Sequence, residues 1–181
     1  MIELQGTSIF LRELTVDNVT PEYIGWLNDP EINQYLESRF THHSIESVRE
    51  FVAKKKESET EFFFGIFLKN SQKHVGNVKI GPINREHAFA TMGIFVGDKT
   101  SWGKGIASEA ISLIIHFAFT CLQLFRVDAG VYEKNTASLR TFQKNGFVVE
   151  GRRRMHRVTH DGRTSIILLG ILREEWEALN P

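Results

Sequence analysis

Residues 92–122 form the most informative stretch of the chain, MGIFVGDKTSWGKGIASEAISLIIHFAFTCL. Its opening residues up to Val96 are mostly apolar and β-prone, which predicts the end of a strand. A polar, glycine-containing segment follows from Gly97 to Gly105. From Ala107 to Leu122, apolar residues recur at helical spacing in one continuous stripe. The stretch therefore predicts a strand, a glycine loop and a long amphipathic helix, in that order.

The glycine loop Trp102-Gly103-Lys104-Gly105 is a candidate anion site. Unpaired N–H groups at a helix start attract phosphate, and glycine lets the backbone approach it closely. A P-loop is excluded because its glycine spacing differs and Gly105 follows the lysine where Ser or Thr is required. A dinucleotide fingerprint would need a glycine at Ser108, although Asp128 lies at a suitable distance for a ribose-binding acid. A plain turn that starts the helix is the alternative interpretation.

The remaining sequence predicts a mixed α/β or α+β fold. Thr20, Asp29 and Ser44 are capping residues before three short helices. Another helix is expected from Asn135 to Asn145-Gly146, where glycine suits the left-handed end. With no linker or repeat, residues 1–181 are expected to form a single domain. Strands are expected at residues 8–14, 62–68, 75–80, 88–96, 127–131, 147–151 and 166–171, with a turn at Asp161-Gly162.

Charge and composition narrow the class of protein. Basic and acidic residues both number 22, so no whole-protein field favours nucleic acid or an anionic membrane as a partner. The balance is uneven: residues 1–60 carry 6 − 11 = −5, residues 61–125 carry 6 − 4 = +2, and residues 126–181 carry 10 − 7 = +3. No apolar run reaches the ~20 residues of a membrane span, and no signal peptide is visible. The cytoplasm is therefore the expected compartment.

Several segments jointly resemble the GNAT superfamily of acetyl-CoA-dependent N-acetyltransferases, in its RimJ/RimL-like branch. Met92–Val96 and Trp102–Ala110 are similar to the strand and pyrophosphate loop that hold the cofactor. The resemblance implies a single-domain GNAT fold, with a mixed, mostly antiparallel twisted sheet flanked by helices. The other similar segments are Trp26–Pro30, Asn135–Ser138, Phe142–Phe147, Glu150–Arg152, Asp161–Gly162 and Leu169–Gly170.

The resemblance also implies which residues bind acetyl-CoA. Backbone groups of Ile94, Phe95 and Val96 would bind the pantetheine arm like an added strand, and one N–H there would stabilise the oxyanion. The pyrophosphate would lie on the loop, and the sulfur near the next helix. The residues concerned are Trp102, Gly103, Lys104, Gly105, Ile106 and Ala107 in the loop, and Asn135, Ser138 and Phe142 in the helix.

The usual catalytic acid and base of the family are both missing. Phe142 replaces the tyrosine that often protonates the thiolate, and Thr91 stands near the usual glutamate base. Ser138 is the candidate proton donor, with an uninvolved serine at a helix start as the alternative. His156 is the candidate base because histidine titrates near neutrality, with an uninvolved surface histidine as the alternative. Weaker candidates for the base are His74, Glu86 and His87.

Three further features of the sequence need separate interpretation. The cluster Arg152-Arg153-Arg154 with Arg157 is either an anion site near the acceptor or a solvated hairpin. His42-His43 lacks a third ligand at a recognisable spacing, so no metal site is expected. Cys121 is expected to pack in the core.

The sequence therefore predicts acetyl transfer from acetyl-CoA to a primary amine. The branch implies a protein N-terminal amine as the acceptor, and the segment Trp26–Pro30 also resembles members that act on amino-sugar nucleotides. The acidic early helices would wall the acceptor site and suit a cationic amine. RimL-like relatives suggest a homodimer. A catalytically silent acyl-CoA-binding or regulatory module is the alternative.

Overall fold

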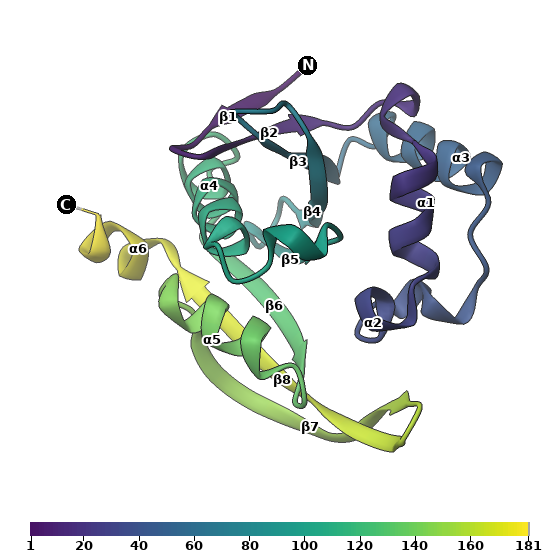
Figure 1. The fold of residues 1–181 in the computed structure, drawn as a ribbon. Coiled ribbons are helices and arrows are strands. Elements are labelled where there is room, and N and C mark those ends of the chain that lie inside the picture. Colours follow the sequence, from purple (N-terminus) through teal and green to yellow (C-terminus); the bar gives the residue numbers. More distant parts are fainter. Residues whose placement is uncertain (181) are drawn as a thin grey trace.

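The computed structural model describes residues 1–180, in which eight strands form one mixed sheet (Figure 1). The order across the sheet is β1-β2-β3-β4-β5-β6-β8-β7. Only β5 and β6 pair in parallel, and every other neighbouring pair is antiparallel. The predicted fold class is confirmed. The strands are β1 Glu3–Gln5, β2 Ile9–Glu13, β3 Phe62–Leu68, β4 His74–Asn84, β5 Phe89–Val96, β6 Arg126–Tyr132, β7 Val148–Thr159 and β8 Gly162–Leu172.

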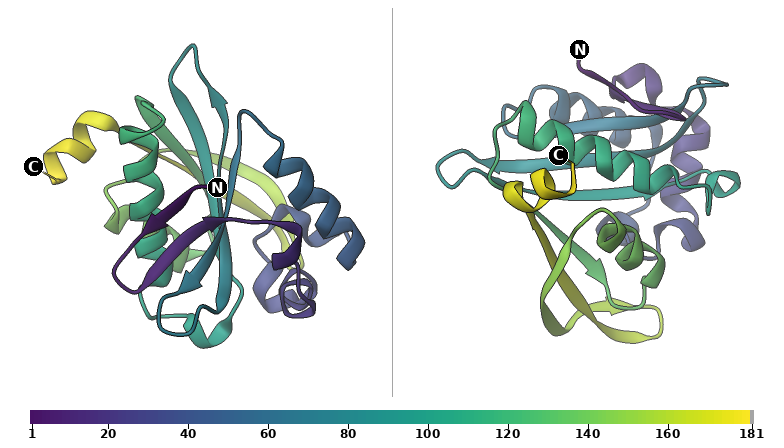
Figure 2. Two further views of the ribbon diagram at one scale, coloured as in Figure 1. Left: turned by 90° about the horizontal axis from the view of Figure 1, so that it is seen from above. Right: turned by 90° about the vertical axis from the view of Figure 1, so that its left-hand side faces the viewer.

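Helices cover both faces of this sheet, α3 on one side and α4 on the other (Figure 2). None of the helices in residues 1–180 is both long and apolar enough to span a membrane. The α-helices are α1 Pro21–Asn28, α2 Pro30–Asn33, α3 Ile45–Lys56, α4 Ile106–Thr120, α5 Thr136–Lys144 and α6 Arg173–Leu179, and the 3-10 helices are η1 Val16–Asn18, η2 Glu37–Phe40 and η3 Lys99–Ser101.

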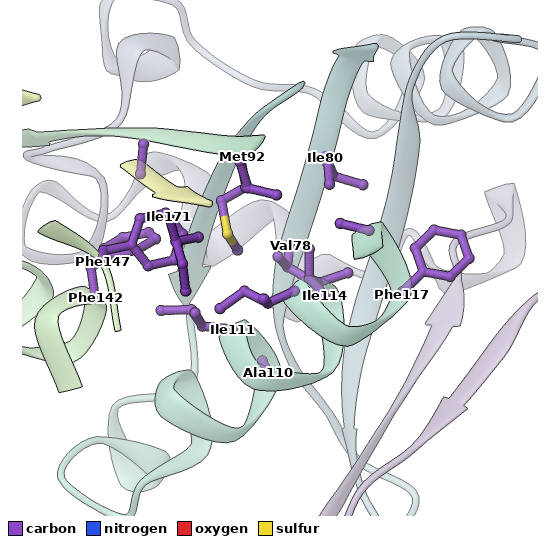
Figure 3. Close-up of a cluster of buried hydrophobic side chains, with 14 of the residues drawn as sticks. Val78, Ile80, Met92, Ala110, Ile111, Ile114, Phe117, Phe142, Phe147 and Ile171 are labelled. Carbon is purple, nitrogen blue, oxygen red and sulfur yellow. The ribbon is translucent and has the colours of Figure 1, made fainter. Parts of the chain in front are cut away.

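Helix α4 builds the main core against one face of the sheet. Its predicted apolar stripe is buried, with Ile111 and Ile114 at 0% exposure. Both side chains point toward Val78 and Met92 of the central strands (Figure 3). Burial of each such side chain contributes about 1.5–3 kcal/mol. Packing of this stripe therefore fixes where α4 begins, at Ile106, relative to the end of β5.

A second, aromatic core lies on the opposite face, under α1 and α3. Thr20 caps α1 by accepting the Tyr23 N–H over 3.2 Å, as predicted from the Thr-Pro-Glu start. The buried face of α1 then presents Tyr23 and Trp26 to this core. This second core lies over β2 and β3 and includes Phe95 of β5. Thr91 and Gly93, earlier on the same face of β5, are left exposed.

Strands β7 and β8 are longer than the sequence predicts. β7 continues through the arginine cluster to Thr159, and β8 begins at Gly162. The turn therefore comprises His160 and Asp161, one residue before the predicted Asp161-Gly162. Most of β7 is exposed, so its residues show no alternation between apolar and polar that would indicate a strand. Strand β1 and helix α6 were not predicted either, because both are short elements at the ends of the chain.

Two side chains of the α4 region differ from expectation. Cys121 is exposed rather than packed in the core, because α4 ends at Thr120 and the chain turns before the next apolar contact. Glu109, on the polar side of the helix, is not a solvated residue. Its carboxylate accepts the N–H groups of Thr7 and Ser8 and the Ser8 hydroxyl, and so ties the β1–β2 turn to α4.

Candidate active site

The centre of the candidate site is a gap between β5 and β6. The two strands pair from Phe89 to Met92 and from Arg126 to Ala129. Beyond this point β5 continues against β4, and β6 diverges from it against β8 (Figure 1). Among the described residues, no bridge joins 93–96 to 130–132. The facing edges of these two segments leave backbone groups available to a ligand.

The ladder geometry determines which backbone groups of β5 face the gap. The Gly97 N–H donates to the Val75 carbonyl over 2.8 Å, which makes the adjacent pair of Val96 and Gly76 a non-hydrogen-bonded one. The N–H and C=O of Val96 therefore point away from β4 and into the gap. The two-residue period places the backbone groups of Ile94 there too. Of the three residues predicted to hold the pantetheine arm, Ile94 and Val96 face the gap, and Phe95 does not.

The opposite edge of the gap comes from β6. The Glu133 N–H donates to the Ser165 carbonyl over 3.0 Å, so the backbone groups of Tyr132 point away from β8. The same alternation directs those of Gly130 into the gap. Both strands therefore present backbone donors and acceptors to the space between them.

Three of these groups already have partners within the protein. The Trp102 indole N–H donates to the Val96 carbonyl, and the Asn135 N–H donates to the Tyr132 carbonyl, both over 2.8 Å. Trp102 thus joins the glycine loop to the end of β5. An extended ligand with amide groups can pair with the rest, as an added strand would. The Gly130 N–H is used in the parallel pairing of Met92 with Ala129. The remaining groups are the N–H of Ile94, Val96 and Tyr132 and the C=O of Ile94 and Gly130.

The loop after β5 adopts left-handed backbone at two glycines. Gly103 has a φ of 72° and Gly105 a φ of 80°, values that other residues adopt only with strain. A Cβ atom at either position would have no neighbour within 4 Å, so open space lies above them. Gly105 is the N-cap of α4, so the unpaired N–H groups of a long helix begin at Ile106. Lys104 is exposed between the glycines, and Ala107 is half-buried.

A buried carboxylate holds the start of this loop in place. Asp98 is only 7% exposed, and it accepts hydrogen bonds from Thr100 and from the Ser101 hydroxyl, with the Lys73 ammonium 3.3 Å away. Burial raises the pKa of Asp98, but the bonds from Thr100 and Ser101 outweigh that effect, and the pKa lies below its usual value. The carboxylate therefore stays ionised and anchors the chain between β5 and α4.

Helix α5 brings the second group of predicted residues to the open end of β6. Asn135 caps it by accepting the Ser138 N–H over 3.1 Å. Ser138 is half-buried, and within residues 1–180 its hydroxyl makes no hydrogen bond that would divert it from a ligand. Phe142 is 3% exposed and packs edge-to-face on Phe147, with ring centroids 5.0 Å apart. Phe142 therefore contributes core packing, and contact between Phe142 and a ligand stays a prediction.

His156 lies on an irregular part of the β7–β8 hairpin. Regular pairing is interrupted between Arg153 and Arg157, and Met155 has a φ of 50°. The intervening residues bulge from the strand, and His156 is exposed. Within the described part of the chain, His156 has no hydrogen-bond or ion-pair partner that would orient it toward the gap. Its role as a base stays a prediction.

The arginine cluster does not converge on one point. Arg152 pairs with Glu133 over 2.6 Å, and Arg157 pairs with Glu37 over 2.9 Å. The other two arginines are exposed and form no ion pair within residues 1–180. This arrangement favours the solvated-hairpin interpretation.

The three weaker base candidates do not face the gap. His74 packs between the rings of Trp26 and Phe67, and burial lowers its pKa. Glu86 and His87 lie in the β4–β5 turn, at the end of β5 that is paired with β6.

A polar clasp around Tyr132 is a feature that sequence reasoning missed. The Tyr132 hydroxyl donates to the Glu37 carboxylate and accepts from Arg39 over 2.9 Å. Burial raises the pKa of Tyr132, and the bond to Glu37 adds to this effect. The clasp ties η2 to the end of β6, beside the gap. Its partners lie 95 residues apart, so no local pattern could have indicated it.

No group of three or more His, Cys, Asp or Glu side chains in residues 1–180 is arranged to hold a metal ion. The site is instead a gap in a sheet beside the start of a helix. This arrangement is suited to an extended ligand that carries amides and phosphates.

Comparison with known proteins identifies the family. Residues 8–148 match the Acetyltransferase (GNAT) domain. The chain belongs to the GNAT family. The probable N-acetyltransferase YjcK of Bacillus subtilis (strain 168) is 31% identical over 160 residues, which cover 82% of this chain and 84% of YjcK. The SPbeta prophage-derived uncharacterized N-acetyltransferase YokL of the same organism is 30% identical over 169 residues, which cover 92% of this chain and 93% of YokL.

A solved structure supports the fold assignment. The spermidine N-acetyltransferase from Vibrio cholerae, in complex with CoA and spermine, superposes with a TM-score of 0.85 at 22% identity, covering 94% of this chain and 98% of that one. GNAT enzymes are acetyltransferases that use acetyl-CoA, so the predictions of enzyme class and cofactor are confirmed at the level of the family. The open backbone edges of the gap and the uncrowded glycines at the α4 start fit this cofactor.

Proposed function

We propose that this protein transfers the acetyl group of acetyl-CoA to a primary amine, as a member of the RimJ/RimL-like branch. The observation that carries the proposal is the gap between β5 and β6, which opens beside the glycine-lined start of α4. When bound, acetyl-CoA supplies a thioester that an amine can attack. The residues around the gap provide what this reaction needs from the protein.

Backbone groups of β5 and the loop hold the cofactor in this proposal. The N–H groups of Ile94 and Val96 pair with the pantetheine arm, and one of them stabilises the negative charge that develops on the acetyl oxygen. Trp102 to Ala107 hold the pyrophosphate, with close backbone approach at Gly103 and Gly105.

Helix α5 supplies the proton donor. Asn135 fixes the first turn of the helix, and Ser138 donates a proton to the departing thiolate. As the base, His156 has less structural support, because it is exposed on a bulge of the hairpin.

The acceptor is a primary amine in this proposal, either a protein N-terminus or an amino-sugar nucleotide. The charge of 6 − 11 = −5 in residues 1–60 supports a cationic acceptor, because α1 and α2 belong to this segment. Polyamines form a third class to test, since the Vibrio cholerae enzyme binds spermine in a similar fold. A homodimer and a cytoplasmic location complete the proposal.

An acceptor screen tests the proposed function directly. Thiol release from acetyl-CoA is measured with a peptide bearing a free N-terminus, with spermine and with a UDP-linked amino sugar. We expect amine-dependent release with at least one of them. Tight acetyl-CoA binding without turnover on any amine would instead support the silent acyl-CoA-binding module.

Replacement of Ser138 by alanine is expected to slow turnover by about 10²-fold, because the departing thiolate loses its proton donor. The affinity for acetyl-CoA should change little, since Asn135 still caps α5 through the backbone N–H of residue 138. Steady-state kinetics and calorimetric titration measure the two quantities separately. Ser112→Ala, at an exposed position of α4, is the matched control. An unaltered rate in Ser138→Ala would remove Ser138 from the mechanism.

A further inference from the structure

The closed end of the gap brings together two polar side chains that face away from the main core. The parallel register pairs Thr91 of β5 with Asp128 of β6. Their neighbours Ala90 and Val127 are both 0% exposed and belong to the core under α4. Because side chains alternate along a strand, Thr91 and Asp128 share the opposite face. An extended ligand that enters the gap from the α4 start ends beside this pair.

Two glycines leave space next to Asp128 on the same face. Gly93 follows Thr91 by two residues, and a Cβ atom there would meet nothing within 4 Å. Gly130 follows Asp128 by two residues, and a Cβ atom there would contact only an Ile166 methyl group at 3.4 Å. On this face, the positions of Gly93 and Gly130 beside the gap therefore carry no side chain. This space is available to an acceptor amine.

Asp128 is held in a defined orientation by one neighbour. The Arg126 guanidinium donates through Nε to Oδ1 of Asp128 and also binds the Glu150 carboxylate. The Arg126 guanidinium packs against Gly170, where any side chain would displace it, because a Cβ atom would lie 2.4 Å away. These bonds leave Oδ2 of Asp128 without a protein partner among residues 1–180. The Asp128 side chain is 30% exposed, so part of it can be reached by a ligand.

We propose that Asp128 is the carboxylate that takes the proton of the acceptor amine, with Arg126 as its positioning residue. The inference rests on the proposed acetyl transfer. The amine nitrogen, in its neutral form, bonds to the acetyl carbon, and the carbon–sulfur bond breaks. The nitrogen becomes acidic as its new bond forms, so a proton passes from it to Oδ2 of Asp128. The departing thiolate takes a proton from Ser138, which regains one from solvent, and Asp128 releases its proton to solvent. The products are the N-acetylated amine and the free thiol.

The position of Asp128 supports this role over that of His156. Asp128 lies on the strand that forms one edge of the gap, and its backbone neighbours are fixed by pairing on both sides. His156 lies on an exposed bulge of the hairpin. A rigidly held group loses less freedom when it engages the acceptor, so Asp128 is the better placed carrier of the proton.

Asp128→Asn tests the inference with the amine from the peptide, spermine and UDP-amino-sugar panel that wild-type protein acetylates fastest. We expect kcat to fall by about 10²-fold or more, with an unchanged Kd for acetyl-CoA. In Asp128→Ala, added formate should restore part of the rate, because a free carboxylate can enter the space that the side chain leaves. A structural role for Asp128 would not produce this rescue.

Asp17→Asn, the same change at an exposed carboxylate of η1 outside the proposed site, is the matched control. It should retain most of the wild-type rate. A wild-type rate in Asp128→Asn, an equal loss in both variants, or a lack of formate rescue would overturn the inference. If wild-type protein acetylates none of the three amines, the proposed function itself fails, and the inference with it. The wild-type assay therefore separates the two failures.

Discussion

Gly105→Val is expected to weaken acetyl-CoA binding by at least about 100-fold, which corresponds to about 2.7 kcal/mol. Gly105 adopts a φ of 80°, and its surroundings are open. For a β-branched residue, this left-handed backbone conformation costs about 1–2 kcal/mol. Its side chain would also project into the open space where the pyrophosphate is proposed to lie. Two charge-assisted hydrogen bonds to the phosphate, worth about 1.5–3 kcal/mol each, would then be lost. Isothermal titration calorimetry with acetyl-CoA measures the change.

Gly162 offers a matched control for backbone strain. It is the first residue of β8, next to the β7–β8 turn, with a φ of 114°, and a Cβ atom there would also meet nothing within 4 Å. Gly162→Val should therefore lower the Tm about as much as Gly105→Val does, without an effect on acetyl-CoA affinity. Equal affinity in both variants would show that the loop at Gly105 is only a turn.

Glu109→Ala is expected to reduce the free energy of unfolding by about 2–3 kcal/mol, because it removes the charge-assisted hydrogen bonds that tie the β1–β2 turn to α4. Glu109 accepts from the N–H groups of Thr7 and Ser8 and from the Ser8 hydroxyl. For a chain of this size the loss corresponds to a fall in Tm of about 4–12 °C. Differential scanning calorimetry measures it. Glu177→Ala, at an exposed position of α6, should change the Tm little.

The contribution of Glu109 should depend on pH in a defined direction. Burial raises the pKa of Glu109, but the bonds from Ser8, Ile9 and Thr7 outweigh burial and lower the pKa below its ordinary value of 4.5. A carboxyl whose pKa is lowered by folding stabilises the folded state above its unfolded pKa, and this stabilisation is lost as the pH falls through the folded pKa. The difference in stability between wild type and Glu109→Ala should therefore be full at pH 7 and shrink below pH 4.5. A constant difference down to pH 2 would contradict this account.

The helices and central strands were predictable because their signals are local. The stripe of α4 repeats at helical spacing, and Thr20 and Ser44 cap their helices by bonds to residues three positions ahead. The left-handed glycines of the loop were also visible, since Gly103 and Gly105 precede an apolar periodic run. Such patterns depend on spacing along the chain and need no knowledge of distant contacts.

The exposed hairpin was less predictable. Arginine residues cover β7 on both faces, so its strand shows no period of two, and the bulge between Arg153 and Arg157 follows no local rule. The exposure of Cys121 was also not predictable, because the exposure of a residue just after a helix end depends on where the chain turns next.

The one-dimensional pattern of the chain was thus sufficient for the strand–loop–helix unit at residues 92–122 and for a mixed sheet flanked by helices. Long-range pairing determined the rest. Whether Ile94 or Phe95 faces the gap depends on the register between β4 and β5. Asp128 lies beside Thr91 because two strands 37 positions apart pair in parallel, and the Tyr132 clasp joins residues 95 positions apart. Register and cross-strand neighbours arise from the packing of the whole sheet, so no local stretch of sequence can specify them.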